Sequence, residues 1–87
     1  LTRRERAENV RKRNYWTKYG ENARRVLNAL LDKYAETGIE NIEEMKILTV
    51  EPLKDLGTAT EIVSIFGGKA GYLTALKELE DEIYAVA

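Results

Sequence analysis

Apolar residues recur at helical spacing through the first 37 residues of the chain. Successive members of the series lie 3, 4, 3, 4 and 4 positions apart, which places them on one face of a helix. The series is Trp16, Tyr19, Ala23, Val26, Leu30 and Tyr34. The segment holds no proline, and Gly20 interrupts its helix propensity without changing the phase of the series. We therefore predict one long helix, or two nearly coaxial helices, ending at Gly38.

Cap and turn residues divide the middle of the chain into short helices. Asn41 followed by Glu44 is typical of a helix N-terminus and predicts a helix over residues 42–48. Pro52 suits the first turn of a further short helical segment that ends at Gly57.

The next short helix has the clearest local signature in the chain. Thr58 and Glu61 have the S/T-x-x-E spacing in which a hydroxyl and a carboxylate each accept a hydrogen bond from a backbone N–H group at a helix start. They predict a helix over residues 59–66. Gly67 and Gly68 are expected to end it, because glycine readily adopts a positive φ.

A closing helix is predicted over residues 69–85, where apolar residues again recur at helical spacing. The β-prone run at 47–50 is too short and isolated to form a sheet. We therefore expect an all-α fold, a small helical bundle with a long N-terminal helix or helix pair, two short middle helices and a closing C-terminal helix. Eighty-seven residues suffice for one domain, 1–87. Because the chain begins without Met, we expect it to be a fragment of a longer polypeptide.

The composition excludes the classes of catalytic and metal site that depend on cysteine or histidine. The chain contains no cysteine and no histidine, so it lacks thiolate nucleophiles, cysteine metal ligands and the commonest general base. Ser64 has no histidine partner, and Lys69 is followed by Ala70, whereas a P-loop requires Ser or Thr there. We predict no catalytic, cofactor-binding or metal-binding residue. No apolar run approaches the roughly 20 residues of a membrane span, so a cytoplasmic protein without a membrane partner is expected.

The net charge of −1 hides a sharp division along the chain. Residues 1–25 carry nine bases against three acids, a local charge of +6, whereas residues 26–87 carry five bases against twelve acids, a local charge of −7. Acids at 78–82 lie near the C-terminus of the predicted last helix, where the helix dipole disfavours negative charge. We therefore expect the basic segment 3–18 to lie near 78–82, within the domain or in a neighbouring copy.

Bases and aromatic residues are interleaved in the N-terminal segment, a composition found on nucleic-acid-binding surfaces. Trp16 and Tyr19 belong to the apolar series and are expected to pack in the core, whereas Tyr15 lies off the series and should be more open. The bases surround the helix, so it is either solvated or sandwiched between partners. The candidate contact residues for nucleic acid or a protein partner are Arg3, Arg4, Arg6, Arg11, Lys12, Arg13, Tyr15 and Lys18.

Several short motifs carry a family resemblance. They are Asn14-Tyr-Trp-Thr-Lys-Tyr-Gly20, Ala23-Arg-Arg-Val-Leu-Asn-Ala-Leu-Leu-Asp-Lys-Tyr34-Ala, Leu56-Gly-Thr58-Ala-Thr-Glu-Ile62, Phe66-Gly-Gly-Lys-Ala-Gly-Tyr-Leu73 and the segment 79–84. Their order and spacing resemble the C-terminal domain of type I restriction enzyme R subunits, in the EcoEI-like branch, from Arg11 to Tyr84. Ala59 stands where the family often has proline, which leaves the capping of the following helix intact.

The resemblance implies a place in a cytoplasmic bacterial or archaeal complex. In this family the R subunit is an ATP-dependent type I site-specific deoxyribonuclease that uses ATP and Mg²⁺. Its nuclease and DNA-translocating motor lie upstream of this domain in the same chain, and it joins a core of methyltransferase (M) and specificity (S) subunits. None of the catalytic motifs falls in this sequence. The resemblance therefore implies a non-catalytic helical domain that joins the motor to the methyltransferase core. The alternative is contact with double-stranded DNA through the basic N-terminal helix.

Overall fold

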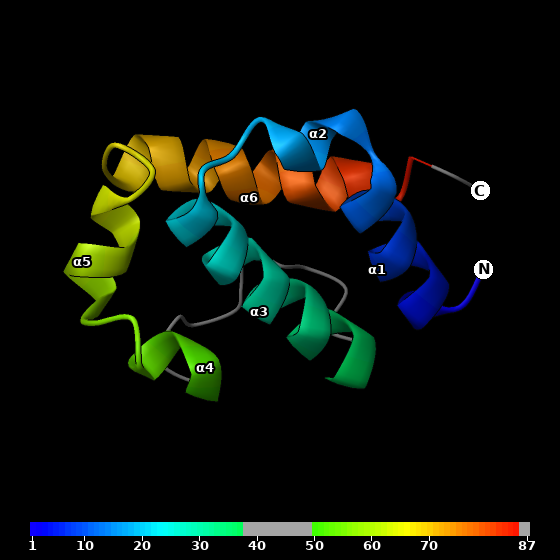
Figure 1. The fold of residues 1–87 in the computed structure, drawn as a ribbon, viewed down its shortest axis with the longest axis horizontal. Helices are drawn as coiled ribbons and strands as arrows, with labels where there is room; N and C mark the ends of the chain where they lie inside the picture. The colour runs from blue at the N-terminus through cyan, green and yellow to red at the C-terminus, as the bar shows by residue number, and fades with distance from the viewer. Residues whose placement is uncertain (38–49, 86–87) are drawn as a thin grey trace.

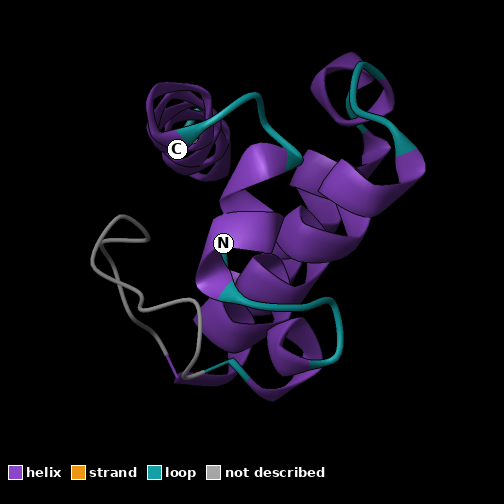
Figure 2. Ribbon diagram, turned by 90° about the vertical axis from the view of Figure 1, so that its left-hand side faces the viewer, coloured by secondary structure: helices purple, strands orange, loops and turns teal. Residues whose placement is uncertain are grey.

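The computed structural model describes residues 1–37 and 50–85, and every regular element within them is a helix (Figure 1). Figure 2 shows the same residues as helix and loop, without a strand. The elements are α1 (Arg3–Lys12), α2 (Asn14–Thr17), α3 (Glu21–Thr37), α4 (Glu51–Lys54), α5 (Ala59–Ser64) and α6 (Lys69–Ile83). The all-α prediction is thus confirmed.

The N-terminal segment forms a helix pair that folds back on itself. Arg13 adopts an extended backbone (φ −87°, ψ 158°), α2 makes a single turn, and α3 begins at Glu21. The expected coaxial arrangement is wrong, because α1 packs against both α3 and α6. A helix over residues 1–37 would be about 55 Å long at 1.5 Å per residue, whereas the longest dimension of the fold is 34 Å. The chain reversal lets α1 bury Ala7 and Val10 in the same core as α3.

One hydrophobic core joins all helices except the short α2, whose aromatic residues pack against it. Figure 1 shows α6 lying across one side of the domain, with α1 and α2 near one end and α5 near the other. The buried residues of this core are Ala7, Val10, Val26, Leu27, Ala29, Leu30, Leu31, Tyr34, Val50, Leu53, Ile62, Tyr72, Leu76, Leu79 and Ile83. Because α3 and α6 supply most of them, these two helices set the position of the others.

The local signals in the second half are confirmed. Thr58 Oγ1 accepts a hydrogen bond from the Glu61 N–H group at 3.3 Å, and Glu61 Oε1 accepts one from the Thr58 N–H group at 3.3 Å. Gly67 and Gly68 have φ values of +85° and +116°. Pro52 lies in the first turn of α4, as predicted.

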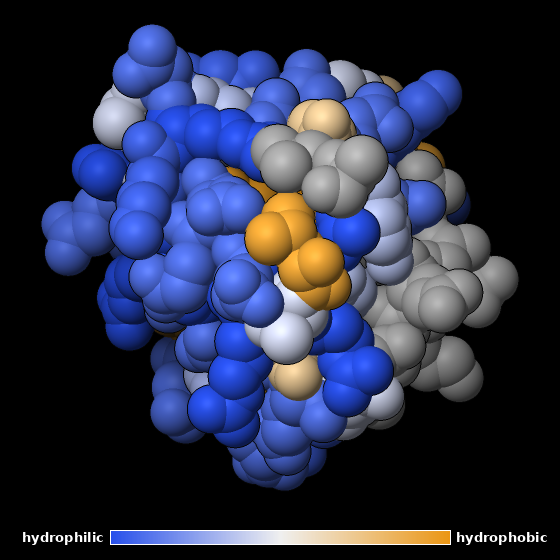
Figure 3. Space-filling model, turned by 90° about the vertical axis from the view of Figure 1, so that its right-hand side faces the viewer, coloured by the Kyte–Doolittle hydropathy of each residue, from blue (hydrophilic) through white to orange (hydrophobic). Residues whose placement is uncertain are grey.

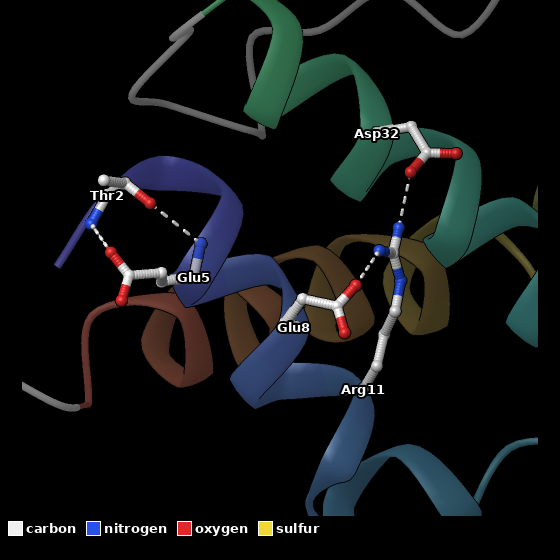
Figure 4. Close-up of polar contacts among 5 residues, drawn as sticks. All are labelled: Thr2, Glu5, Glu8, Arg11 and Asp32. Carbon is white, nitrogen blue, oxygen red and sulfur yellow. Dashed lines mark hydrogen bonds and ion pairs between the residues drawn. The ribbon is translucent and has the colours of Figure 1, made fainter.

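A second capping box, at the start of α1, was not predicted. Thr2 Oγ1 accepts from the Glu5 N–H group and Glu5 Oε1 accepts from the Thr2 N–H group, both at 3.1 Å (Figure 4). The same S/T-x-x-E spacing marks it in the sequence. The hydrogen bonds lower the pKa of the Glu5 carboxyl below its ordinary value.

The predicted element boundaries are close elsewhere. Helix α6 ends at Ile83, two residues before the predicted end, and α5 ends at Ser64. The predicted helix over 42–48, its Asn41 cap and the stop at Gly38 lie outside the described residues.

Candidate partner-contact surface

Two arginines of the N-terminal segment bind the C-terminal end of α6. Arg13 Nη1 lies 2.7 Å from Glu82 Oε2 and also donates to the Glu82 carbonyl oxygen. Arg6 Nη1 donates to the Ile83 carbonyl oxygen at 3.3 Å, and its guanidinium lies 5.5 Å from the centroid of the Tyr84 ring. The last carbonyls of a helix lack partners within the helix and form the negative end of its dipole. The guanidinium groups therefore cap α6, and the predicted proximity of 3–18 to 78–82 is confirmed within the domain.

Lys18 and Tyr19 bind a second acid of α6. Lys18 Nζ lies 2.7 Å from Glu78 Oε2, and the Tyr19 hydroxyl donates to the same oxygen at 3.0 Å. These hydrogen bonds hold the pKa of the Glu78 carboxyl below its ordinary value, the Lys18 bond being the largest cause. The same bond raises the pKa of the Lys18 ammonium. The pair lies at the surface, so it fixes the position of α2 on α6 more than it stabilises the fold.

The lowered pKa of Glu78 predicts an acid-dependent loss of stability. A carboxyl whose folded pKa lies below its unfolded value, here 4.5, contributes stability that is present above pH 4.5 and is lost as the pH falls through the folded pKa. The urea concentration at the midpoint of unfolding should fall between pH 5 and pH 3 in the unchanged chain. We expect it to fall less steeply in Glu78→Gln, which lacks the titrating carboxyl. Asp81→Asn, which removes an exposed acid of the same helix, is the control. If the urea midpoints of Glu78→Gln and of the unchanged chain fall equally with pH, the Glu78 contact contributes nothing to the acid-dependent stability.

Arg11 joins α1 to α3. Its guanidinium contacts Glu8 Oε1 at 3.3 Å and Asp32 Oδ1 on the facing helix (Figure 4). The Arg11 side chain is only 24% exposed. It lies in a groove between the two helices whose lining includes Ala7 and Ala35. Arg11 is therefore engaged within the domain, and its substitution would remove a contact between α1 and α3 as well as a charge.

The three aromatic residues of this region are half-buried against the core. The Tyr15 hydroxyl lies 3.5 Å from the Ala75 carbonyl oxygen, and the Tyr15 and Tyr19 rings meet edge to face at 5.4 Å. Burial is the main cause that raises the pKa of the Tyr15 hydroxyl. Trp16 and Tyr19 pack against the core as predicted, but Tyr15 is no more open than they are, because the turn at Arg13 rotates it towards α6.

The remaining candidates, Arg3, Arg4 and Lys12, are exposed and make no ion pair with any described residue. Figure 3 shows the side of the molecule on which α1 lies, and this face is mainly hydrophilic. The eight candidate residues therefore divide into two sets. Arg6, Arg11, Arg13, Tyr15 and Lys18 make contacts within the domain. Arg3, Arg4 and Lys12 remain available to a partner. The sequence alone could not separate the two sets, because the acids that Arg11, Lys18 and Arg13 contact on other helices lie 21, 60 and 69 positions away in the chain.

Two hydroxyl groups considered as nucleophiles, those of Ser64 and Thr58, are engaged in local structure. The Ser64 hydroxyl donates to the Glu61 carbonyl oxygen at 2.7 Å, and the Thr58 hydroxyl caps α5. Within residues 1–37 and 50–85, no group of three or more Asp or Glu side chains is placed to hold a metal ion. No helix in the described part of the chain has both the length and the apolar character needed to cross a membrane.

Comparison with known proteins places the chain in a family. Residues 1–84 match the family described as EcoEI R protein C-terminal. The chain is 56% identical over 85 residues to the type I restriction enzyme EcoAI endonuclease subunit of Escherichia coli. The alignment covers 97% of this chain but 10% of that relative, so the chain spans about a tenth of the relative's length. No solved structure matches the chain. The chain therefore belongs to the EcoEI R protein C-terminal family, the C-terminal domain of type I restriction enzyme R subunits.

Proposed function

We propose that this domain is a non-catalytic assembly module that joins the motor of an R subunit to the methyltransferase core formed by M and S subunits. The parent chain would be an ATP-dependent deoxyribonuclease that uses ATP and Mg²⁺, and its chemistry would lie outside this domain. The observation that carries the proposal is the match of residues 1–84 to the C-terminal domain of a subunit about ten times longer. A small helical domain attached to a large enzyme is suited to holding that enzyme in position relative to other subunits.

The interhelical contacts support a docking role. Arg13, Lys18 and Arg11 tie the N-terminal helices to α6 and α3 at three separate points. Such ties fix the outer faces of the helices relative to one another before any partner binds. Binding to a preformed surface avoids part of the entropic cost of ordering side chains and loops.

Deletion of the domain from an intact R subunit tests this proposal. We expect an R subunit lacking residues 11–84 of this domain to lose co-purification with the M and S subunits, whereas the intact R subunit retains it. Gel filtration and thermal melting of the shortened subunit control for misfolding of the rest of the chain. Undiminished association of a folded, shortened subunit would refute the proposal.

A second candidate function is contact with the backbone of duplex DNA. It is favoured by the exposure of Arg3, Arg4 and Lys12, which have no acid partner among the described residues. Glu5 and Glu8 on the same helix are already engaged, in the capping box and with Arg11. The local charge of +6 in residues 1–25 adds a long-range attraction for phosphate.

The salt dependence of DNA binding tests the second candidate. Each phosphate contact adds about −0.9 to the slope of log K against log salt concentration. Replacement of Arg3, Arg4 and Lys12 by Gln in the R subunit should therefore make the slope shallower by about 2.7. The charge-matched control replaces three exposed lysines elsewhere on the domain, Lys54, Lys69 and Lys77, by Gln; of these, Lys54 is paired with Glu51. Equal slopes for the two variants, measured by fluorescence anisotropy with duplex DNA, would rule out contact through α1.

A further inference from the structure

A shallow hollow of about 280 Å³ lies where α2 meets the first turns of α3. The ring of Trp16 lines it from α2, and α3 contributes Arg24, Arg25 and Asn28, together with Glu21. We propose that this Trp16–Arg hollow is the docking face of the domain and that it binds a protein surface presenting carboxylates. The inference rests on the proposed assembly function and names the surface that would perform it.

The two arginines of the hollow are not used by the fold. Arg25 is exposed and Arg24 is half-exposed, and neither makes an ion pair with a described residue. They lie near the N-terminal, positive end of α3, where the helix dipole gives a base no stabilisation. In contrast, Arg13 and Arg6 bind the negative end of α6. Arg24 and Arg25 are therefore free to bind an external carboxylate, which a guanidinium can hold through two parallel hydrogen bonds.

Trp16 gives the hollow a rigid apolar wall. The side chain is half-buried and packs against the core, so little conformational entropy remains to be lost when a partner covers its exposed part. Tryptophan and arginine are enriched among the residues that dominate binding energy at protein interfaces, and lysine is depleted from interfaces. The hollow contains one Trp, two Arg and no Lys, and it also contains one Glu, a residue type depleted from interfaces. Its tryptophan and arginines are the residues suited to anchor a protein partner.

The charges of the hollow favour a protein over DNA. Glu21 lies in the same hollow as the two arginines, and its carboxylate would repel a phosphate backbone. A protein partner can place acids opposite Arg24 and Arg25 and a hydrogen-bond donor opposite Glu21. The Asn28 amide can donate to a carboxylate through its NH₂ group and accept from a donor through its oxygen. The alternation of charge is thus complementary to a specific protein surface and is poorly matched to a uniform polyanion.

Charge reversal in the intact R subunit tests the docking face. We expect Arg24→Glu with Arg25→Glu to weaken binding to the M and S subunits by at least about 30-fold, the effect typical of interface hot spots. The neutral variant, Arg24→Gln with Arg25→Gln, should weaken binding less and make it less sensitive to salt. The matched control, Lys69→Glu with Lys77→Glu, reverses two exposed bases on α6 and should bind within about threefold of the unchanged subunit. Titration of the labelled R subunit with a purified M and S core measures all four affinities.

The outcomes separate this proposal from the assembly function. If deletion of the domain abolishes association but the Arg24 and Arg25 reversal leaves the affinity unchanged, the assembly function stands and this docking face is wrong. If deletion has no effect, the assembly function itself fails. Unchanged core binding combined with weaker duplex DNA binding by the reversed variant would assign the hollow to DNA and overturn the proposal. Because both arginines are at the surface, unchanged thermal melting of the variants should confirm that the fold is retained.

Discussion

Replacement of Leu79 by Ala is expected to lower the free energy of unfolding by about 3 kcal/mol, within a range of about 2–5 kcal/mol. Leu79 lies on α6, is fully buried and belongs to the core shared with α3. Its truncation removes apolar contacts and leaves a cavity that the helices around it cannot close without moving. A domain of this size has a total stability of roughly 4–13 kcal/mol, so this one change removes a large share of it.

The same helix provides a matched control. Leu73 lies on α6 and is 42% exposed, so Leu73→Ala should change the free energy of unfolding by less than about 0.5 kcal/mol. Urea denaturation followed by circular dichroism measures both variants. The midpoint of thermal unfolding should fall by roughly 12–24 °C for Leu79→Ala and by only a few degrees for Leu73→Ala. Equal losses at the two positions would contradict the described burial of α6.

Local signals in the sequence predicted the second half of the fold well. The Thr58 capping box, the two glycines after α5 and the spacing of apolar residues in α6 each depend on residues within one or two helical turns. Interactions of this range are set by the sequence itself, so a pattern indicates them directly. The capping box of Thr2 obeyed the same rule and could have been found in the same way.

The path of the N-terminal segment could not be predicted in this way. The apolar series remained in helical phase across Gly20, yet α2 ends at Thr17 and α3 begins only at Glu21. The chain also leaves the helix at Arg13, before the series begins. At this turn the Arg13 guanidinium contacts Glu82, 69 positions away in the chain. A periodic pattern shows which residues share a face but does not show where a distant side chain makes a turn favourable.

The sequence predicted that the two ends of the chain carry opposite charge and attract each other. It did not predict which individual bases remain available on the surface. The division between +6 and −7 indicated that the two ends of the chain attract each other, and the contacts of Arg13 and Lys18 with α6 follow that expectation. Which bases remain available depends on packing. Arg24 and Arg25 belong to the basic stretch 1–25 but lie outside the candidate segment 3–18, and Trp16 was expected to pack in the core. Their shared hollow exists because α2 turns beside the start of α3.

Replacement of Gly71 by Ala is expected to destabilise the domain by about 1–3 kcal/mol, although alanine is the better helix former by about 1 kcal/mol. A Cβ atom at position 71 would lie 1.9 Å from the carbonyl oxygen of Phe66. That oxygen belongs to the backbone of the turn that joins α5 to α6, so it cannot move aside as a flexible side chain could. The start of α6 must shift, and the contact between the Phe66 and Tyr72 rings, now at 5.5 Å, shifts with it.

Gly20 is the matched control for this prediction. It precedes α3, its φ is not in the positive range, and no atom lies within 4 Å of the position of an added Cβ. The Gly20 carbonyl oxygen accepts a hydrogen bond from the Arg24 N–H group, and Gly20 is the N-cap of α3, a position where glycine is preferred to alanine. This preference offsets the gain from restricting the unfolded chain, so Gly20→Ala should change the free energy of unfolding by less than about 1 kcal/mol. Urea denaturation should therefore show a clearly larger loss for Gly71→Ala than for Gly20→Ala. A stabilised Gly71→Ala variant would mean that the turn after α5 does not approach α6 as closely as described, and the glycine of the Gly-Gly-Lys-Ala-Gly motif would then need another explanation.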